Sequence, residues 1–496
     1  MKKNHFISQL RFCGFALLGI GALILCSCAD DGYNDDERWS STVKNTQLSS
    51  PDAANIKVTA SADGKRQTLS WPVVNGAGGY KVTVYVQDGV DTLAKDSVID
   101  GCAITLARAE NTYYEMLIHA LGNVKNNNTS SIEPTVMNWN TFLPANAIAP
   151  NEDKFDLYEW MQVDSMKTLI ETPKDGSLVI DLQPNVTYRL SNIIDLGYNK
   201  VVLRTLSKDG RATIVYDNGA SIRFGGGFVL NNININGLAT TDPILGLSET
   251  PNEAILGTGS YYIINDPVTI QNCYIYNVQR QLVHDTKKKY CIHNFTIDNS
   301  VVNFTTDAGM SGGSYIQIYD GGGFINLFNL TNSTFWNSTN ETLGELKHAK
   351  YFVRYNNSGR CTRAGFDHDE TNISNCTFYN IAKTGQVANR AGLDGQKTSW
   401  FDIKNNIFVD CGSNQVPRRF VGRVGDPEKV VFNNNTYWFD GSPEVCDPEA
   451  SSNNTQYDSG YQLQSDPAFE DVENGDFTPT GAEQVALKTG DPRWFE

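Results

Sequence analysis

The sequence predicts an all-β protein, and three observations lead to this prediction. The chain has 496 residues, of which 40 % are hydrophobic and 11 % aromatic, so it is able to bury a sizeable core in two or three domains. Glycine is frequent and about one residue in ten is asparagine, a composition typical of short strands joined by turns. In addition, one asparagine-containing motif returns several times between residues 228 and 437.

The first 28 residues predict an export signal. Lys2, Lys3 and Arg11 precede an apolar run over residues 12–25, which is too short to span a bilayer comfortably. The run ends in a Leu-Cys-Ser-Cys sequence that resembles the signal of a bacterial lipoprotein, with Cys28 as the lipidated residue. A secretory signal cleaved nearby is the alternative. The resemblance implies an outer-membrane protein anchored by its lipid chains.

Residues 29–50 form an acidic stretch that resembles the tether of surface-exposed Bacteroidetes lipoproteins, and this implies a protein that faces outward. An ordinary flexible linker is the alternative. The net charge of −16 and the pI near 4.9 exclude nucleic acid as a partner. The seven cysteines after Cys28 are odd in number and lack tight spacing, which argues against a disulfide framework or a zinc site. Buried thiols are therefore expected at Cys102, Cys273, Cys291, Cys361, Cys376, Cys411 and Cys446.

Residues 51–145 predict a small seven-stranded β-sandwich. Alternating apolar residues recur over residues 56–60, 80–86 and 112–120, with turn signals between them. The last of these runs resembles a fibronectin type III module, in which Trp71 would be the core tryptophan and Tyr114 the tyrosine corner. The resemblance implies a spacer between the anchor and the larger domain, and a binding module is the alternative.

Residues 146–175 are expected to form a linker and a short capping helix. Apolar residues follow helical spacing at Phe155, Tyr158, Met161, Met166 and Leu169. A helix at this place would cover the open end of a coiled sheet and block edge pairing.

Residues 176–440 are expected to form a right-handed parallel β-helix. An apolar-x-Asn-x-x-apolar motif recurs at intervals of 27 to 43 residues, which suits one turn of such a helix. The repeated asparagine should adopt a left-handed backbone at a tight bend and bond to its equivalent in the next coil. It stands at Asn232, Asn272, Asn299, Asn332, Asn375, Asn405 and Asn434. A propeller is the main rival, but it requires four strand patterns per repeat.

The asparagine ladder resembles that of the pectin-lyase-like superfamily. Residues 441–496 similarly look like a terminal coil and C-terminal cap. The whole chain resembles Bacteroidetes outer-membrane lipoproteins that carry a fibronectin-like module before such a helix. The resemblance implies a polysaccharide ligand, pectin-like or otherwise rich in uronates, and neighbouring glycan-uptake proteins in the outer membrane as partners.

Part of the sequence resembles a catalytic motif of pectate lyases. The sequence Gln-Val-Pro-Arg-Arg-Phe follows an Asn-rich strand, and Gln415 stands where the resemblance would place a catalytic arginine. A neutral amide does not abstract a proton, so the question of an enzyme stays open. Lys383, Arg418 and Arg419 are the remaining catalytic candidates. Sugar-binding candidates are Lys383, Arg390, Arg418 and Arg423, with Tyr351 and Tyr355 from long segments expected to be groove-forming loops (237–262, 305–327 and 338–370).

Calcium is the only cofactor that the sequence suggests. Asp367, Asp369 and Glu370 lie close together before the Asn375 strand and could supply carboxylate oxygens, although a solvated acidic loop is the alternative. Three functions remain open. The first is a surface protein that binds a uronate-containing polysaccharide, the second a surface lyase or hydrolase on the same scaffold, and the third an adhesin or structural surface protein.

Overall fold

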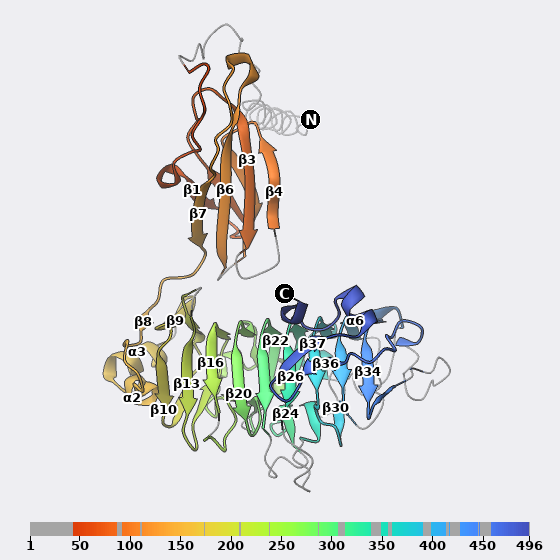
Figure 1. Cartoon of the computed structure of the whole chain (residues 1–496). Helices are drawn as coiled ribbons and strands as arrows, with labels where there is room; N and C mark the ends of the chain where they lie inside the picture. The colour runs from red at the N-terminus through yellow and green to blue at the C-terminus, as the bar shows by residue number, and fades with distance from the viewer. Residues whose placement is uncertain are drawn as a thin grey trace, which may run out of the picture. The chain divides into compact units, whose positions relative to one another are not determined.

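The computed structural model shows two compact units, Met1–Leu143 and Pro144–Glu496, which are considered separately (Figure 1). Within the described part of the chain, no helix has the length and apolar character needed to cross a membrane. The structure describes residues 43–86, 92–109, 112–172, 174–207, 210–237, 239–285, 287–305, 313–338, 349–355, 360–389, 398–412, 416, 427–444, 446 and 458–495.

The first unit is a sandwich of two antiparallel sheets. One sheet has the order β1-β2-β5 and the other the order β4-β3-β6-β7, which together make the seven strands expected from the sequence. The strands are β1 (Lys57–Ala60), β2 (Arg66–Ser70), β3 (Ala77–Val86), β4 (Thr92–Ile99), β5 (Ala103–Ala107), β6 (Tyr113–Gly122) and β7 (Thr135–Asn140).

The two residues predicted to mark this sandwich occupy the expected places. Trp71 is 4 % exposed and lies edge-on to Tyr80, with the ring centroids 5.4 Å apart. The hydroxyl of Tyr114 accepts a hydrogen bond from the backbone N–H of Ala109 (2.8 Å) and donates to its carbonyl (3.3 Å), so the ring is fixed at a corner of the sandwich. Alternating residues of the strands thus form a core separate from that of the second unit.

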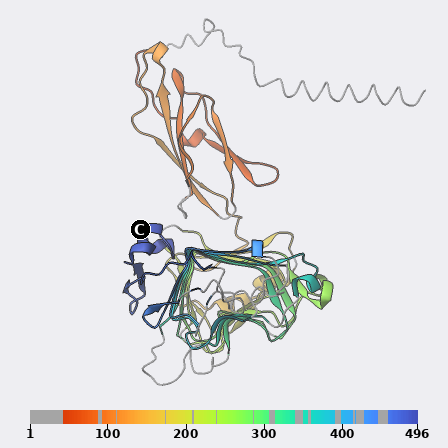
Figure 2. The same ribbon diagram turned by 90° about the vertical axis from the view of Figure 1, so that its right-hand side faces the viewer.

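The second unit is a parallel β-helix, as predicted. Most coils contribute one strand to each of three sheets, here named sheets A, B and C. Equivalent strands of successive coils pair in parallel, and the last strand of sheet B, Ser442–Pro443, pairs antiparallel. Figure 2 looks along the coils, which lie one behind another. Sheet A has the order β8-β9-β12-β15-β19-β22-β25-β28-β31-β33, sheet B β10-β13-β16-β20-β23-β26-β29-β32-β34-β35, and sheet C β11-β14-β17-β21-β24-β27-β30.

The strands of the β-helix are short, and most have three to six residues. In sheet A they are β8 (Ala147–Ile148), β9 (Ser177–Leu182), β12 (Lys200–Thr205), β15 (Phe228–Asn231), β19 (Val268–Gln271), β22 (Tyr290–Asp298), β25 (Phe324–Thr331), β28 (Asp369–Ser374), β31 (Ser399–Lys404) and β33 (Val430–Asn433), and β18 (Tyr262–Ile264) pairs with β22. In sheet B they are β10 (Thr187–Leu190), β13 (Ala212–Tyr216), β16 (Ile233–Asn236), β20 (Tyr274–Val278), β23 (Val301–Phe304), β26 (Thr334–Asn337), β29 (Thr377–Tyr379), β32 (Ile407–Val409), β34 (Thr436–Phe439) and β35 (Ser442–Pro443).

Sheet C comprises β11 (Ile193–Asp195), β14 (Ser221–Phe224), β17 (Leu245–Leu247), β21 (Val283–His284), β24 (Ser314–Ile318), β27 (Tyr351–Tyr355) and β30 (Gln386–Asn389). Three of these strands, β17, β24 and β27, lie inside the segments that the sequence suggested were loops. That expectation was wrong for the strand portions. The sequence did not reveal these three strands because each has only three to five residues and no repeated asparagine marks its end.

Helices and a hairpin cover parts of the β-helix. α2 (Leu157–Met161) and α3 (Asp164–Glu171) bury Leu157, Met161, Met166 and Ile170 against the first coils, which is the capping role expected from the sequence. Near the other end of the chain lie the hairpin of β36 (Phe469–Asp471) and β37 (Asp476–Pro479) and the helix α6 (Ala482–Leu487), while α4 (Arg360–Ala364) precedes β28.

All seven predicted asparagines have positive φ, between 44° and 57°, at the bend from sheet A to sheet B. Their ladder is nevertheless incomplete. The amides of Asn299, Asn375 and Asn434 donate to the equivalent asparagine of the preceding coil (2.8, 3.3 and 3.2 Å). Asn332 instead donates to the carboxylate of Asp298 (3.1 Å), so a neighbouring acceptor competes within the same bend.

The interior is a continuous stack of apolar side chains. Ile270, Ile297, Leu330, Ile373, Ile403 and Phe432 follow one another in register through sheet A, as the motif predicted. The described cysteines carry free thiols, and all of them except the half-buried Cys102 are buried. Burial raises the pKa of Cys273 to about 11, so these thiols behave as apolar core residues.

Candidate functional site

One polar or glycine residue per coil forms a line on the outer face of sheet C, here named the outer row. Strand register places its members side by side in the order Asp195, Arg223, Gly246, His284, Gln317, Arg354 and Asn389. Their neighbours Ile222, Leu245 and Val283 point inward and are buried, because successive side chains of a strand alternate between faces. The β-helix therefore presents a straight polar track along its axis.

A cleft of about 360 Å³ opens along this track. Arg223, Gly246 and His284 belong to its lining, together with Asp242, Glu249 and Lys287. A Cβ atom on Gly246 would meet Cγ of Arg223 at 3.1 Å, so glycine at this position lets the arginine lie across the strand. There Nη1 of Arg223 pairs with Oε1 of Glu249 at 2.6 Å.

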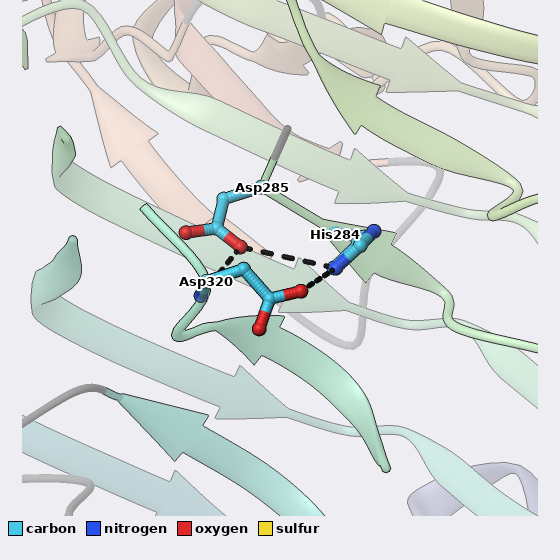
Figure 3. A group of neighbouring side chains, drawn as sticks. All are labelled: His284, Asp285 and Asp320. Atoms are coloured by element: carbon cyan, nitrogen blue, oxygen red, sulfur yellow. Dashed lines mark hydrogen bonds and ion pairs between the residues drawn. The ribbon is translucent and has the colours of Figure 1, made fainter. Parts of the chain in front are cut away.

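His284, Asp285 and Asp320 converge beside this cleft (Figure 3). Nε2 of His284 lies 2.9 Å from Oδ2 of Asp320 and 3.9 Å from Oδ1 of Asp285. Asp285 is fully buried, and burial raises its pKa to about 6. The backbone N–H groups of Asp320 and Gly321 donate to its two oxygens (3.1 and 2.7 Å), which fixes the carboxylate in place.

Arg354 forms a second feature of the outer row. Its guanidinium carbon lies 3.6 Å from the ring centroid of Tyr319 and 5.1 Å from that of Tyr351. Among the residues that the structure describes, no carboxylate pairs with Arg354, and its Nε has no hydrogen-bond partner. A guanidinium group that lies over an aromatic ring and pairs with no described carboxylate is suited to bind an acidic ligand.

Lys383 does not lie free in a groove. Its Nζ pairs with Asp410 (3.1 Å) and Asp440 (3.2 Å), so two carboxylates from later coils neutralise it. These contacts connect successive coils. The geometry favours a structural role for this lysine over the sugar-binding or catalytic role expected from the sequence.

The three predicted calcium ligands do not converge. Alternation along β28 turns the side chain of Asp369 inward and that of Glu370 outward. Asp369 accepts a hydrogen bond from Oγ of Ser399 (2.9 Å), while Glu370 bonds to His368 (2.8 Å), and Asp367 is exposed in the preceding loop. In this structure they therefore do not form one metal site, because strand geometry separates residues that are adjacent in sequence.

The two tyrosines predicted to bind sugar lie in β27 and are largely covered. Tyr351 is 6 % exposed and Tyr355 is 3 % exposed, and Tyr355 packs into the core, where burial raises its pKa. Neither ring offers a free face for stacking on a sugar. The remaining predictions, Arg390, Gln415, Arg418, Arg419, Arg423 and the lipidation site Cys28, lie outside the described residues.

Sequence reasoning missed the residues that do converge. His284 and Asp285 follow a short apolar run, and Asp320 comes 35 residues later beside three glycines. Each segment is unremarkable by itself. The available signal was their separation, which is close to one coil of the repeat, but only a correct assignment of sheet C would have made it useful.

Family models of domains of unknown function match three parts of the chain. The DUF4992 model matches residues 1–188, the DUF4957 model residues 186–338 and the DUF5123 model residues 371–494. Each covers less than half of the chain. No curated protein matches the sequence.

Among solved structures, the chain is similar to an Fn3-like protein from Clostridium thermocellum, at 19 % identity over 20 % of this chain and 93 % of that one, with a TM-score of 0.14. It is also similar to pectate lyase PelI from Erwinia chrysanthemi, at 10 % identity over 67 % of this chain and 84 % of that one (TM-score 0.16). Pectate lyase Pel3 from Pectobacterium carotovorum is also similar, at 11 % identity over 57 % of this chain and 84 % of that one (TM-score 0.13). The class of protein defined by the strand register itself is a β-sandwich followed by a parallel β-helix.

Proposed function

We propose that this protein binds an acidic, uronate-containing polysaccharide along the outer row of sheet C. The observation that carries the proposal is the row itself, in which strand pairing repeats one outward position per coil at about 4.8 Å. A linear polysaccharide also repeats its hydrogen-bonding groups along its length. A straight polar track therefore suits such a ligand better than a compact one.

Arg354 supplies the preference for an acidic sugar. A guanidinium group forms charge-assisted, two-pronged hydrogen bonds with a carboxylate, and the ring of Tyr319 holds this one in place. The neighbouring amide of Asn389, in the next coil, can bond to a sugar hydroxyl group.

The setting of this proposed function is the cell surface. Lipidation at Cys28 would anchor the chain in the outer membrane, the acidic tether and the sandwich would serve as spacers, and the β-helix would capture glycan for neighbouring uptake proteins. The sequence features described above support this part of the proposal.

Affinity electrophoresis and calorimetry with polygalacturonate, and with a neutral glycan of similar length, test the proposal. The full chain should bind the acidic polymer, and Arg354→Ala should weaken binding by about tenfold or more, since a hydrogen bond to a charged group contributes ~1.5–3 kcal/mol. Arg189→Ala is the matched control. This arginine lies on sheet B, where Asp156 and Asp217 neutralise it, and the variant should bind like the wild type.

Equal binding by Arg354→Ala and the wild-type protein would contradict the proposed role of the outer row. The same samples distinguish binding from catalysis. If the absorbance of unsaturated uronide appears in the mixture with wild-type protein, the protein is a lyase and not a binding protein alone.

A further inference from the structure

We propose that His284, Asp285 and Asp320 form a binding site for a divalent transition metal, with Zn²⁺ as the best-suited ion. His284 and Asp285 are neighbours in one coil, Asp320 comes from the next coil, and the three side chains point toward one another (Figure 3). One imidazole nitrogen and two carboxylate oxygens are ligands that Zn²⁺ accepts, whereas a calcium site would need six to eight oxygens. This site is distinct from the three acidic residues that the sequence suggested for calcium.

The distances fit a small ion. Zn²⁺ bonded to nitrogen and oxygen at ~2.0–2.1 Å in a tetrahedral site separates its ligand atoms by about 3.3 Å. Nε2 of His284 lies 2.9 Å from the oxygen of Asp320 and 3.9 Å from that of Asp285, so the observed separations lie on either side of that value. Modest side-chain rotations would equalise them.

The backbone holds the carboxylates in position. A Cβ atom on Gly321 would clash with the carbonyl oxygen of Lys288, so glycine allows the turn after β24 to pack closely against the preceding coil. That approach brings Asp320 beside Asp285. Nε2 of Gln317 also donates to Oδ2 of Asp320 (3.2 Å), which orients this ligand from outside the site.

The negative charge of the two carboxylates favours a bound cation. Asp285 is fully buried, and among the described residues the ion pairs of Asp285 and Asp320 are with His284 alone, without any lysine or arginine. Buried carboxylates are ordinarily paired with a cation or coordinate a metal. A metal ion would supply that charge at the place where the three ligands meet.

The cleft provides an independent indication that a ligand binds here. His284 and Asp285 line it, so the metal would have an open coordination position facing the cleft. Ser221 lines the same cleft, is 1 % exposed, and its Oγ has no hydrogen-bond partner. A buried hydroxyl without a partner is costly, and a polar ligand or metal-bound water in the cleft would satisfy it.

Metal titration of the full chain, after removal of metal by a chelator, tests the site. Calorimetry with Zn²⁺ should show one site in the wild type, and His284→Ala and Asp320→Asn should each weaken binding by about 100-fold or more. Asp285 is left unchanged, because it also holds the backbone. His368→Ala is the matched control, since His368 also bonds to a single carboxylate (Glu370, 2.8 Å) but lacks a third ligand. It should bind Zn²⁺ like the wild type.

Co²⁺ provides a spectroscopic readout that does not depend on function. Ligation by nitrogen and oxygen should give weak visible bands that His284→Ala abolishes, with the fold of each variant checked by circular dichroism. The proposal is overturned if the wild-type protein does not bind Zn²⁺ at micromolar concentration, or if His284→Ala binds it unchanged. It is likewise overturned if the Co²⁺ spectrum shows only thiolate charge-transfer bands, because cysteine would then be the ligand.

Discussion

Asp458 is a buried acid close to the last coil of the β-helix. Its Oδ2 accepts hydrogen bonds from the hydroxyl of Tyr437 (2.6 Å) and the amide of Asn435 (3.0 Å), whereas Oδ1 is buried without a partner. Burial outweighs these two bonds and raises the pKa of Asp458 from 3.8 to about 6. The folded protein therefore holds this proton more tightly than the unfolded chain does.

This shift predicts a pH dependence of stability. Between about pH 4 and pH 6 the folded state binds more protons, so the contribution of Asp458 to the free energy of unfolding falls as the pH rises. Asp458→Asn keeps an acceptor for both bonds and removes the buried charge. We expect it to raise the free energy of unfolding at pH 7.5 by ~1–3 kcal/mol and to have little effect below pH 4.

Chemical denaturation followed by tryptophan fluorescence at several pH values measures this effect. Asp175→Asn is the control, because it removes the same charge at an exposed position of the same unit. If Asp458→Asn is less stable than the wild type at pH 7.5, or has the same pH dependence, the assigned cost of burying this charge is wrong.

The bend from sheet A to sheet B is the element that the sequence predicted best, but the prediction covered only one of its two hydrogen-bonded ladders. The left-handed positions were predicted correctly because asparagine occupies each of them, at the same place in every repeat of the motif. A second ladder lies one residue later, where a side chain accepts a hydrogen bond from a backbone N–H of the preceding coil. The sequence did not predict it because the residue type varies between coils: Ser300, Ser333, Asn406 and Asn435. A hydroxyl and an amide both accept a backbone N–H, so here geometry repeats while residue type does not.

Asn406 and Asn405 allow the two ladders to be compared at one bend. Asn406 is fully buried and accepts from the N–H of Cys376 (2.9 Å), while its amide donates to Ile373 (2.9 Å) and Asn435 (2.9 Å). We expect Asn406→Ala to lower the free energy of unfolding by ~2–4 kcal/mol, because it leaves buried groups unpaired.

Asn405→Gly is the control at the neighbouring position. The φ of Asn405 is 56°, which glycine adopts without strain, and the side chain is only partly buried, so a loss below ~1 kcal/mol is expected. Urea unfolding of the two variants in parallel checks the order. A larger loss for Asn405→Gly would show that the exposed ladder stabilises the bend more than the buried one.

The whole molecule consists of two units with separate cores. We therefore expect two unfolding transitions in calorimetry, each responding to its own core substitutions. Trp71→Ala should lower the midpoint temperature of the sandwich transition by roughly ten degrees or more, as ~3–5 kcal/mol for a buried aromatic residue implies, and leave the β-helix transition unchanged.

Ile403→Ala is the reciprocal variant, since Ile403 is fully buried in the β-helix core. It should shift only the other transition. A single transition that either substitution moves as a whole would show that the two units unfold together.

By itself the sequence determined the all-β class, the sandwich with Trp71 and Tyr114 in place, the helical cap on the first coils (although not its division into α2 and α3), and the bend from sheet A to sheet B. These features depend on local periodicity and on backbone conformations that particular residues favour. Only the tertiary structure decided the site. Whether His284 meets Asp320, Arg354 lies on Tyr319 and Lys383 is neutralised depends on which coil lies beside which. Strand register brings residues about one coil apart into contact, and adjacent residues such as Asp369 and Glu370 are sent to opposite faces.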